Sequence, residues 1–179
     1  EIVAAVLAGR EAATLLENLS ASARLRMSGE IPREDVILGA VIGRVLERYQ
    51  PMARMLDVVL TSRLPSTPVT LSANAALLER AVGNLVDNAL SAIRRHGTIS
   101  ISVSHDPILK LVRIEVADDG VGISNEDKIR LFEPNFSTKK TGMGLGLTIV
   151  NSIISDHGGR ISVQDNHPQG AKFVIELPA

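Results

Sequence analysis

Two asparagines, Asn84 and Asn88, lie four positions apart in a stretch whose apolar residues recur at helical spacing. Residues four apart share one face of a helix, so the two amides are expected to point the same way. Amide oxygens are suitable ligands for a hard cation such as Mg²⁺. The polar positions of this stretch are Arg80, Asn84, Asp87, Asn88, Ser91 and Arg95. A plain solvent-facing stripe is the alternative, and the spacing alone does not separate the two interpretations.

A second polar group, Asp118-Asp119-Gly120-Val121-Gly122-Ile123, directly follows a predicted strand. A carboxylate at a strand end can accept a hydrogen bond from an exocyclic amine such as that of adenine. Glycines at alternate positions allow positive φ or a close approach of the backbone to a ligand. The alternative is an ordinary acidic turn.

A third group, Thr141-Gly142-Met143-Gly144-Leu145-Gly146-Leu147-Thr148, leads into a predicted helix. The N-terminus of a helix presents unpaired N–H groups and a positive dipole end, which suit phosphate. Lys139 and Lys140 lie just upstream and can neutralise anionic oxygens. The segment lacks the Lys-Ser/Thr pair of a P-loop, and no βαβ unit surrounds it as a dinucleotide fingerprint requires.

Hydrophobic periodicity and turn residues predict the elements that must position these groups. Helices are predicted over residues 1–27, 34–55, 74–95, 126–131 and 144–157. Strands are predicted over residues 57–62, 69–71, 98–104, 109–117, 160–164 and 171–177. Asn74 is the expected cap of the third helix, and Gly158-Gly159 the expected end of the last. We therefore expect an α+β two-layer sandwich: one mixed sheet with helices on one face, preceded by a long N-terminal helix.

The composition narrows the classes of function. Aromatic residues make up 2% of the chain and the net charge is −1, so we expect no nucleic-acid partner. No apolar run approaches the roughly 20 residues that a membrane-spanning helix needs, and no direct membrane contact is expected. Cysteine is absent, which fits a cytoplasmic location. The chain begins with Glu1 rather than methionine, so we expect it to be a piece of a longer protein.

Taken together and in this order, the three groups resemble motifs of one ATPase superfamily. With Phe132 and Phe136 they are similar to the N box, first glycine box, F box and second glycine box of the histidine-kinase branch of the GHKL ATPases. That superfamily also includes gyrase B, Hsp90 and MutL. Residues 131–147 resemble the short ATP lid of nitrogen-regulation-type kinases. The resemblance covers roughly residues 32–178 and implies the Bergerat ATP-binding fold.

The resemblance also implies roles for individual residues. Asn88 would be the main Mg²⁺ ligand, with Asn84 assisting at the triphosphate, and both would act in catalysis with Lys139 of the lid. Asp118 would bind the adenine amine. Phe132 and Phe136 would anchor the lid. The implied ATP contacts are Asn84, Asn88, Asp118, Gly120, Gly122, Ile123, Thr138, Lys139, Lys140, Gly142, Met143, Gly144, Leu145, Gly146, Leu147 and Thr148.

Two positions depart from the family pattern. Many members carry a Lys-Tyr pair where this chain has Ser91-Ala92, so a cation from that turn must come from Arg95 or be missing. Hydrolytic members place a glutamate, which activates water, at the position of Asn84. A neutral histidine attacks without losing a proton first, so the missing glutamate favours a kinase over an ATPase.

Such kinases carry the phosphoacceptor histidine on the first helix of a dimerising hairpin and pass the phosphoryl group to a response regulator receiver domain. No histidine precedes His96, and none of the four lies on a predicted amphipathic dimer helix. Residues 1–30 therefore resemble the second hairpin helix and a linker, residues 31–179 the catalytic domain, and the parent protein would be a homodimer. The alternatives are a nucleotide-binding regulatory module without phosphotransfer and a GHKL serine kinase of the anti-sigma type.

Overall fold

The structure is a computed structural model of the 179-residue chain. It describes residues 2, 4–6, 8–10, 12–13, 16–17, 20, 31–94, 96–133, 136 and 146–179.

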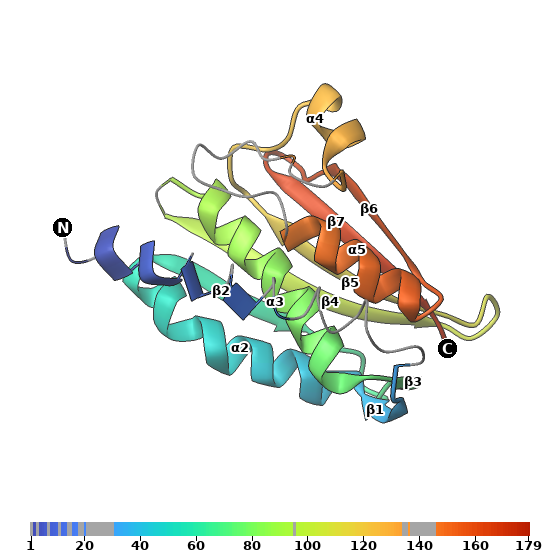
Figure 1. Cartoon of the computed structure of the whole chain (residues 1–179). Coiled ribbons are helices and arrows are strands. Elements are labelled where there is room, and N and C mark those ends of the chain that lie inside the picture. The colour runs from blue at the N-terminus through green and yellow to red at the C-terminus, as the bar shows by residue number, and fades with distance from the viewer. Residues whose placement is uncertain are drawn as a thin grey trace.

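A five-stranded mixed sheet forms the base of the molecule (Figure 1), with strand order β2-β4-β5-β7-β6. Its strands are β2 (Val58–Arg63), β4 (Gly97–Asp106), β5 (Leu111–Asp118), β6 (Arg160–Asp165) and β7 (Ala171–Pro178). β2 and β4 run parallel, and the other neighbouring pairs are antiparallel. Every second residue of β4 is buried from Ile99 to Val103, as expected of a sheet with one covered face.

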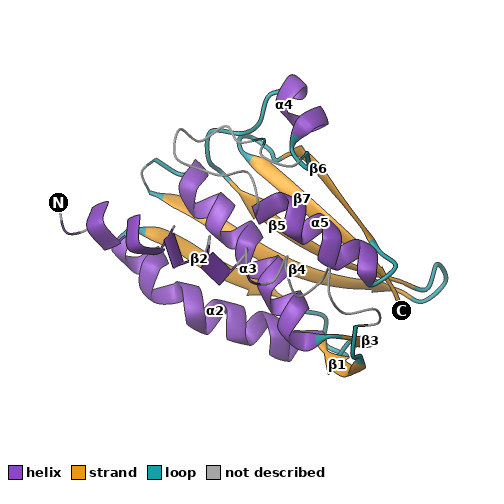
Figure 2. Cartoon of the chain, viewed as in Figure 1, coloured by secondary structure: helices purple, strands orange, loops and turns teal. Residues whose placement is uncertain are grey.

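Helices α2 (Leu38–Met55), α3 (Ala75–Ala92) and α5 (Gly146–Asp156) lie side by side on one face of this sheet (Figure 2). The short helix α4 (Asn125–Arg130) lies at one end, and the strands β1 (Glu34–Ile37) and β3 (Thr70–Ala73) form a small separate sheet. The predicted α+β sandwich with helices on one face of a mixed sheet is thus confirmed. Among the described residues, no helix has the length and apolarity to cross a membrane.

The helix predicted from residue 34 is wrong over its first four positions. Residues 34–37 form β1, which pairs with β3 so that Val36 faces Leu71 across the ladder. Helix α2 begins at Leu38, whose backbone N–H donates to the Val69 carbonyl at 2.9 Å. Strand pairing with a segment more than thirty residues away overrides the local helical periodicity. Pro51 lies inside α2, which continues to Met55 as predicted.

Helix α3 begins as predicted and ends earlier. The Asn74 side chain accepts a hydrogen bond from the Leu77 N–H at 3.0 Å, the N-cap arrangement expected from the sequence. The predicted end at Arg95 lies outside the described residues, but the helix already stops at Ala92, because Ile93 is extended. The Ala92 carbonyl then accepts from the Val121 N–H at 3.0 Å. The end of α3 is therefore fixed by the loop that follows β5.

The described residues between 2 and 20 are helical, and they touch the domain through polar side chains. The Arg10 guanidinium lies 4.9 Å from the centre of the Tyr49 ring, and Glu17 pairs with Arg48 at 3.1 Å. In contrast, Ile2 is 79% exposed and Leu16 is 69% exposed. These apolar side chains are thus exposed rather than packed against the domain. The remainder of the predicted range, from residue 21 on, lies outside the described residues.

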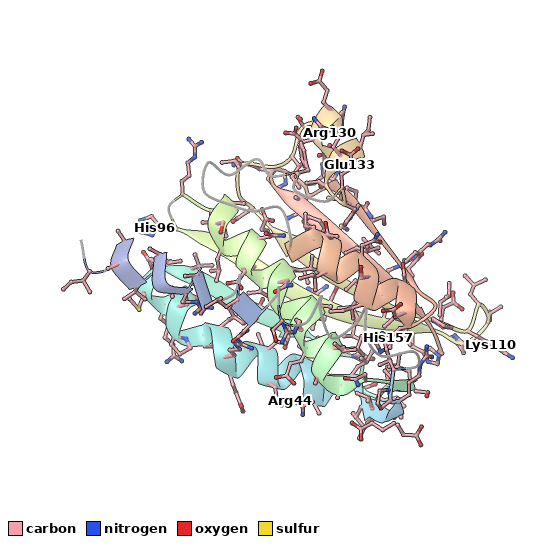
Figure 3. The ribbon with its side chains drawn as sticks, in the orientation of Figure 1. Arg44, His96, Lys110, Arg130, Glu133 and His157 are labelled. Atoms are coloured by element: carbon pink, nitrogen blue, oxygen red, sulfur yellow. The ribbon has the colours of Figure 1, made fainter. Side chains whose placement is uncertain are left out.

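His157 joins the end of α5 to the start of α3 (Figure 3). It is buried, and its Nε2 lies 3.0 Å from the backbone nitrogen of Asn74, which can only donate. Nε2 is therefore the acceptor, and Nδ1 carries the proton and donates to the Ile153 carbonyl at 2.7 Å. This confirms a structural role for one of the four histidines.

We expect His157→Ala to lower the free energy of unfolding by about 2–4 kcal/mol, because it leaves a cavity and removes the acceptor of the Asn74 N–H. Urea denaturation followed by circular dichroism measures this change. His105→Ala is the matched control, since His105 is exposed on β4, and it should change the unfolding free energy by less than about 0.5 kcal/mol. Equal effects of the two substitutions would contradict the assigned role.

Candidate nucleotide-binding site

Asp118 is the last residue of β5, and the pleat of the strand decides where it points. Val112, Ile114, Val116 and Asp118 alternate on the covered face, so the carboxylate extends beneath the helices, where it is 3% exposed. Its Oδ1 accepts from the Gly120 N–H at 2.8 Å and from the Ala171 N–H at 3.4 Å. Burial raises the pKa of Asp118, and these two N–H groups oppose that rise only in part.

Gly120 lies against the end of α3. A Cβ added at Gly120 would lie 2.5 Å from the Ala92 carbonyl oxygen, so no larger residue fits without moving backbone. Gly122 has φ of +76°, in the left-handed region that favours glycine. The geometry thus requires glycine at both positions, by close packing at Gly120 and by positive φ at Gly122. Together the two glycines leave backbone without side chains next to the Asp118 carboxylate.

The neighbouring carboxylate, Asp119, has a different role. Its Oδ1 accepts from the Thr98 N–H at 2.8 Å, and its own N–H donates to the Thr98 carbonyl at 3.3 Å. Asp119 therefore ties the loop to the start of β4, while Asp118 is held below the helices. The alternation along β5 thus separates the two adjacent acids.

Asn84 and Asn88 lie one turn apart on α3, as their spacing predicts. Asn84 is buried, and its Nδ2 donates to the Gly146 carbonyl at 3.4 Å. This contact joins the polar stripe of α3 to the first residue of α5, Gly146, which is the last glycine of the second glycine-rich group. Asn88 is half-buried on the same helix.

The two glycine-rich groups meet α3 at different points along its axis. Gly146 lies at Asn84 and Gly120 lies at Ala92, eight residues further on, which is roughly 12 Å along a helix. A carboxylate thus lies near one end of the site, and amide side chains with a helix N-terminus near the other. This arrangement suits an elongated ligand with an amine-bearing base at one end and an anionic group at the other.

Phe132 and Phe136 are half-buried and pack against the hydrophobic core, as the resemblance implies. The Arg130 guanidinium lies 4.7 Å from the centre of the Phe136 ring, and Arg130 pairs with Glu133 at 3.2 Å (Figure 3). Thr148 Oγ1 lies 3.5 Å from the Phe132 carbonyl, which joins this segment to α5. Of the remaining predicted contacts, Ile123 and Leu147 are half-buried and pack against the core.

Several predicted site residues lie outside the described residues, so their positions stay predictions. They are Thr138, Lys139, Lys140, Gly142, Met143, Gly144 and Leu145, together with Arg95.

The turn between β6 and β7 contacts the loop that carries Asp118, which the sequence does not predict. Asn166 donates to the Asp118 carbonyl at 2.8 Å, Gln169 donates to the Gly120 carbonyl at 2.9 Å, and Gly170 packs directly on Asp118. The sequence predicts a turn there from its proline and glycine, but no local pattern shows that it contacts a loop almost fifty residues earlier.

Comparison with known proteins agrees with this geometry. The family described as "Histidine kinase-, DNA gyrase B-, and HSP90-like ATPase" matches residues 73–179, which include all three polar groups. The chain belongs to this family. Membership in this family supports ATP as the nucleotide that the domain binds.

The relatives of this chain include sensor kinases. The sensor histidine kinase ZraS of Escherichia coli O157:H7 is 34% identical over 143 residues, which cover 80% of this chain and 31% of ZraS. This chain thus spans about a third of the length of that relative.

Solved structures of the family have the same fold. The nucleotide-free catalytic domain of the histidine kinase ThkA superposes with a TM-score of 0.76 at 29% identity, covering 83% of this chain and 96% of that domain. ThkA has also been solved with the response regulator TrrA, at a TM-score of 0.77 and 26% identity over 95% of this chain and 48% of that chain. Full-length ShkA with AMPPNP superposes with a TM-score of 0.80 at 27% identity, covering 98% of this chain and 38% of ShkA.

Proposed function

We propose that this chain binds Mg·ATP and transfers the γ-phosphoryl group to a histidine on the dimerisation helix of a two-component sensor kinase. A response regulator receiver domain would then take the phosphoryl group. One observation supports this proposal: α3 connects the two ends of the site. At one end it contacts the loop with the buried Asp118 carboxylate and Gly120, and at the other it carries Asn84 and Asn88 next to the N-terminus of α5. Because ATP is the proposed substrate, we also propose a cytoplasmic location for the domain.

At the base end, Asp118 would accept a hydrogen bond from the adenine amine. Its Oδ1 already accepts from two backbone N–H groups, which fix the plane of the carboxylate. Gly120, Gly122 and Ile123 would form the floor beneath the base. A bare backbone at Gly120 and Gly122 suits this role, because a flat ring needs close approach over its whole face.

At the phosphate end, Asn88 would be the main Mg²⁺ ligand, with Asn84 assisting. An amide oxygen suits this ion, which keeps several waters and takes few protein ligands. Gly146, Leu147 and Thr148 begin α5, whose N-terminal amides favour anionic oxygens. Thr138, Lys139, Lys140 and residues 142–145 would close over the phosphates, and Lys139 would act in catalysis.

Phosphoryl transfer asks the protein chiefly for positioning and charge neutralisation. The position four residues before Asn88 is Asn84, and an amide cannot act as a base toward water. A neutral imidazole needs no such base, because its ring nitrogen attacks phosphorus with a lone pair. The site therefore favours transfer to histidine over hydrolysis.

We also propose that residues 1–30 are the second helix of the dimerisation hairpin with its linker, and residues 31–179 the catalytic domain. The exposed Ile2, Val6 and Leu16 support this, because exposed apolar side chains are available to a neighbouring helix. The parent protein would be a homodimer through this hairpin.

The test supplies the missing acceptor. The chain is incubated with γ-labelled ATP, Mg²⁺ and a separately purified hairpin that carries its histidine. We expect label on the hairpin in a form that is lost in acid and retained in base, as a phosphorus–nitrogen bond requires. A hairpin in which the histidine is replaced by glutamine is the control and should stay unlabelled.

The other candidate functions give different outcomes. A regulatory module would bind ATP with the same affinity and label no protein. A serine kinase would give an acid-stable phosphate on a partner. Either result would overturn the proposed histidine transfer while leaving ATP binding intact.

A substitution at the proposed Mg²⁺ ligand tests the phosphate end separately. We expect Asn88→Ala to weaken ATP binding by roughly 10- to 100-fold with Mg²⁺ present, because the variant loses one contact to a charged group. With EDTA present the same substitution should change the affinity little. Isothermal titration calorimetry measures both values. Asn151→Ala, at an exposed asparagine of α5, is the control, and an equal loss with and without Mg²⁺ would contradict the metal role.

A further inference from the structure

The turn between β6 and β7, residues 166–170, wraps around the loop that carries Asp118. We propose that two side chains of this turn, Asn166 and Gln169, are positioning residues that set the selectivity of the site for adenine. The proposal rests on the proposed role of Asp118 as the adenine acceptor. Neither side chain needs to touch nucleotide, because each acts on the backbone of the residues that do.

Asn166 holds the turn closed and attaches it to β5. Its backbone N–H donates to the Gly170 carbonyl at 3.0 Å, which closes the turn on itself. Its Nδ2 donates to the Asp118 carbonyl at 2.8 Å. One residue thus fixes both the shape of the turn and the peptide plane that follows Asp118.

Gln169 makes the second attachment, two residues further along the loop. Its Nε2 donates to the Gly120 carbonyl at 2.9 Å. The side chains of Asn166 and Gln169 therefore hold the two carbonyls on either side of Asp119. Since the Asp119 carboxylate is itself fixed to Thr98 at 2.8 Å, each residue from 118 to 120 has its own attachment.

The backbone of the turn adds two further constraints. The Ala171 N–H donates to Asp118 Oδ1 at 3.4 Å, so the turn also contacts the carboxylate itself. The Gly170 carbonyl lies 3.5 Å from the position that a Cβ of Gly122 would take, so it limits the floor beneath the base. The turn is anchored in its own right, because Asp165 at the end of β6 pairs with Lys128 of α4 at 2.6 Å.

These attachments matter for selectivity because adenine is distinguished by the direction of one hydrogen bond. ATP presents an amine donor to the carboxylate, whereas ITP presents a carbonyl oxygen at the same position. A carboxylate held in one orientation rejects ITP, because two acceptors would face each other without a proton. A carboxylate whose backbone shifts loses the favourable contact with ATP, while ITP has no such contact to lose.

The chain offers a matched pair of variants. Gln169→Glu keeps the size of the side chain and places an oxygen against the Gly120 carbonyl. Gln164→Glu makes the same substitution at an exposed position of β6, in the same hairpin and with the same change of charge. Asn166→Asp is the second test variant, in which an oxygen faces the Asp118 carbonyl. Isothermal titration calorimetry gives the affinity of each for ATP and for ITP, and thermal melting checks the fold.

We expect Gln169→Glu to weaken ATP binding about tenfold, the value of a single hydrogen bond, and to leave ITP binding unchanged. Asn166→Asp should do the same, and Gln164→Glu should change neither affinity. The measured ratio of ATP to ITP affinity should therefore fall only when the attachments at 166 or 169 are removed.

Two results would overturn the positioning role. In the first, both Gln169→Glu and Asn166→Asp keep the full preference for ATP. In the second, they lose ATP and ITP affinity in equal proportion, which is the effect of a general loss of structure. An unchanged chain that binds ATP and ITP equally would instead overturn the adenine role of Asp118, and with it the positioning role that rests on it, while histidine transfer would keep its own test. Failure of histidine transfer with intact ATP selectivity would leave the positioning role standing.

Discussion

Replacing Asp118 by asparagine is expected to weaken ATP binding severely and to leave the fold at least as stable as before at neutral pH. The substitution keeps the size of the side chain and an oxygen that can accept from the Gly120 N–H, which now lies 2.8 Å from Oδ1. The other oxygen becomes an NH₂ group, which faces the adenine amine donor to donor. Loss of a charge-assisted bond and an added unsatisfied donor together should weaken ATP binding by at least about 100-fold.

The effect on stability has the opposite sign. Burial raises the pKa of Asp118 above its ordinary value of about 3.9, so the fold favours the protonated side chain. The stability that this shift contributes is present below the pKa of the unfolded chain and is lost as the pH rises through the folded pKa. At neutral pH the buried carboxylate therefore lowers the free energy of unfolding, and an amide relieves that cost. A denaturation midpoint equal to or above that of the unchanged chain is expected.

The same raised pKa predicts how ATP affinity depends on pH. The carboxylate is the form that accepts from adenine, so affinity should fall as the pH drops toward the raised pKa, before an ordinary exposed aspartate would be protonated. Titration calorimetry from neutral pH downward measures this loss, and Asp119→Asn should show the same loss over the same window.

Asp119→Asn is the control for both measurements. Asp119 is exposed, and its asparagine counterpart keeps an oxygen for the Thr98 N–H, so ATP affinity should stay within a few-fold of its original value. If Asp119→Asn removed ATP binding and Asp118→Asn did not, the assignment of the two acids would have to be reversed.

The parts of this structure that the sequence predicts well are those set by local chemistry. Asn74 caps α3 because a short polar side chain can reach the N–H of Leu77 three residues on. Gly158 ends α5 with φ of +73°, as a glycine after a helix usually does. The spacing of Asn84 and Asn88 is enough to place both on one side of α3.

The parts that the sequence does not predict depend on contacts between distant segments. Residues 34–37 continue a helical pattern, but pairing with β3 makes them a strand. Asn166 and Gln169 stand in an ordinary turn, and their roles come from carbonyls 48 and 49 residues earlier in the chain. No local pattern of residue types carries that information, because a backbone carbonyl can belong to any residue.

Gly170→Ala is expected to have the largest effect on stability of any single methyl group added to the hairpin between β6 and β7. Gly170 has φ of +102°, where an L side chain is strained. An added Cβ would overlap the Asp118 carbonyl oxygen and lie 2.8 Å from the Asp119 Cα, and both of these are backbone atoms that cannot rotate away. The turn would have to leave the loop, so we expect the free energy of unfolding to fall by more than about 4 kcal/mol.

Gly158→Ala separates backbone strain from this overlap. Gly158 also has positive φ, at +73°, but an added Cβ there would meet only the Pro178 side chain, at an ordinary 3.7 Å. Strain alone should cost about 1–2 kcal/mol, and Gly158→Ala should keep the full affinity for ATP. If urea denaturation gave equal losses for the two variants, conformational strain would account for both, and the packing of Gly170 on Asp118 would not matter. The other outcome is that only Gly170→Ala loses ATP affinity, at temperatures where this variant stays folded. The adenine site then depends on Gly170, which lies more than fifty residues from the Asp118 carboxylate that it supports.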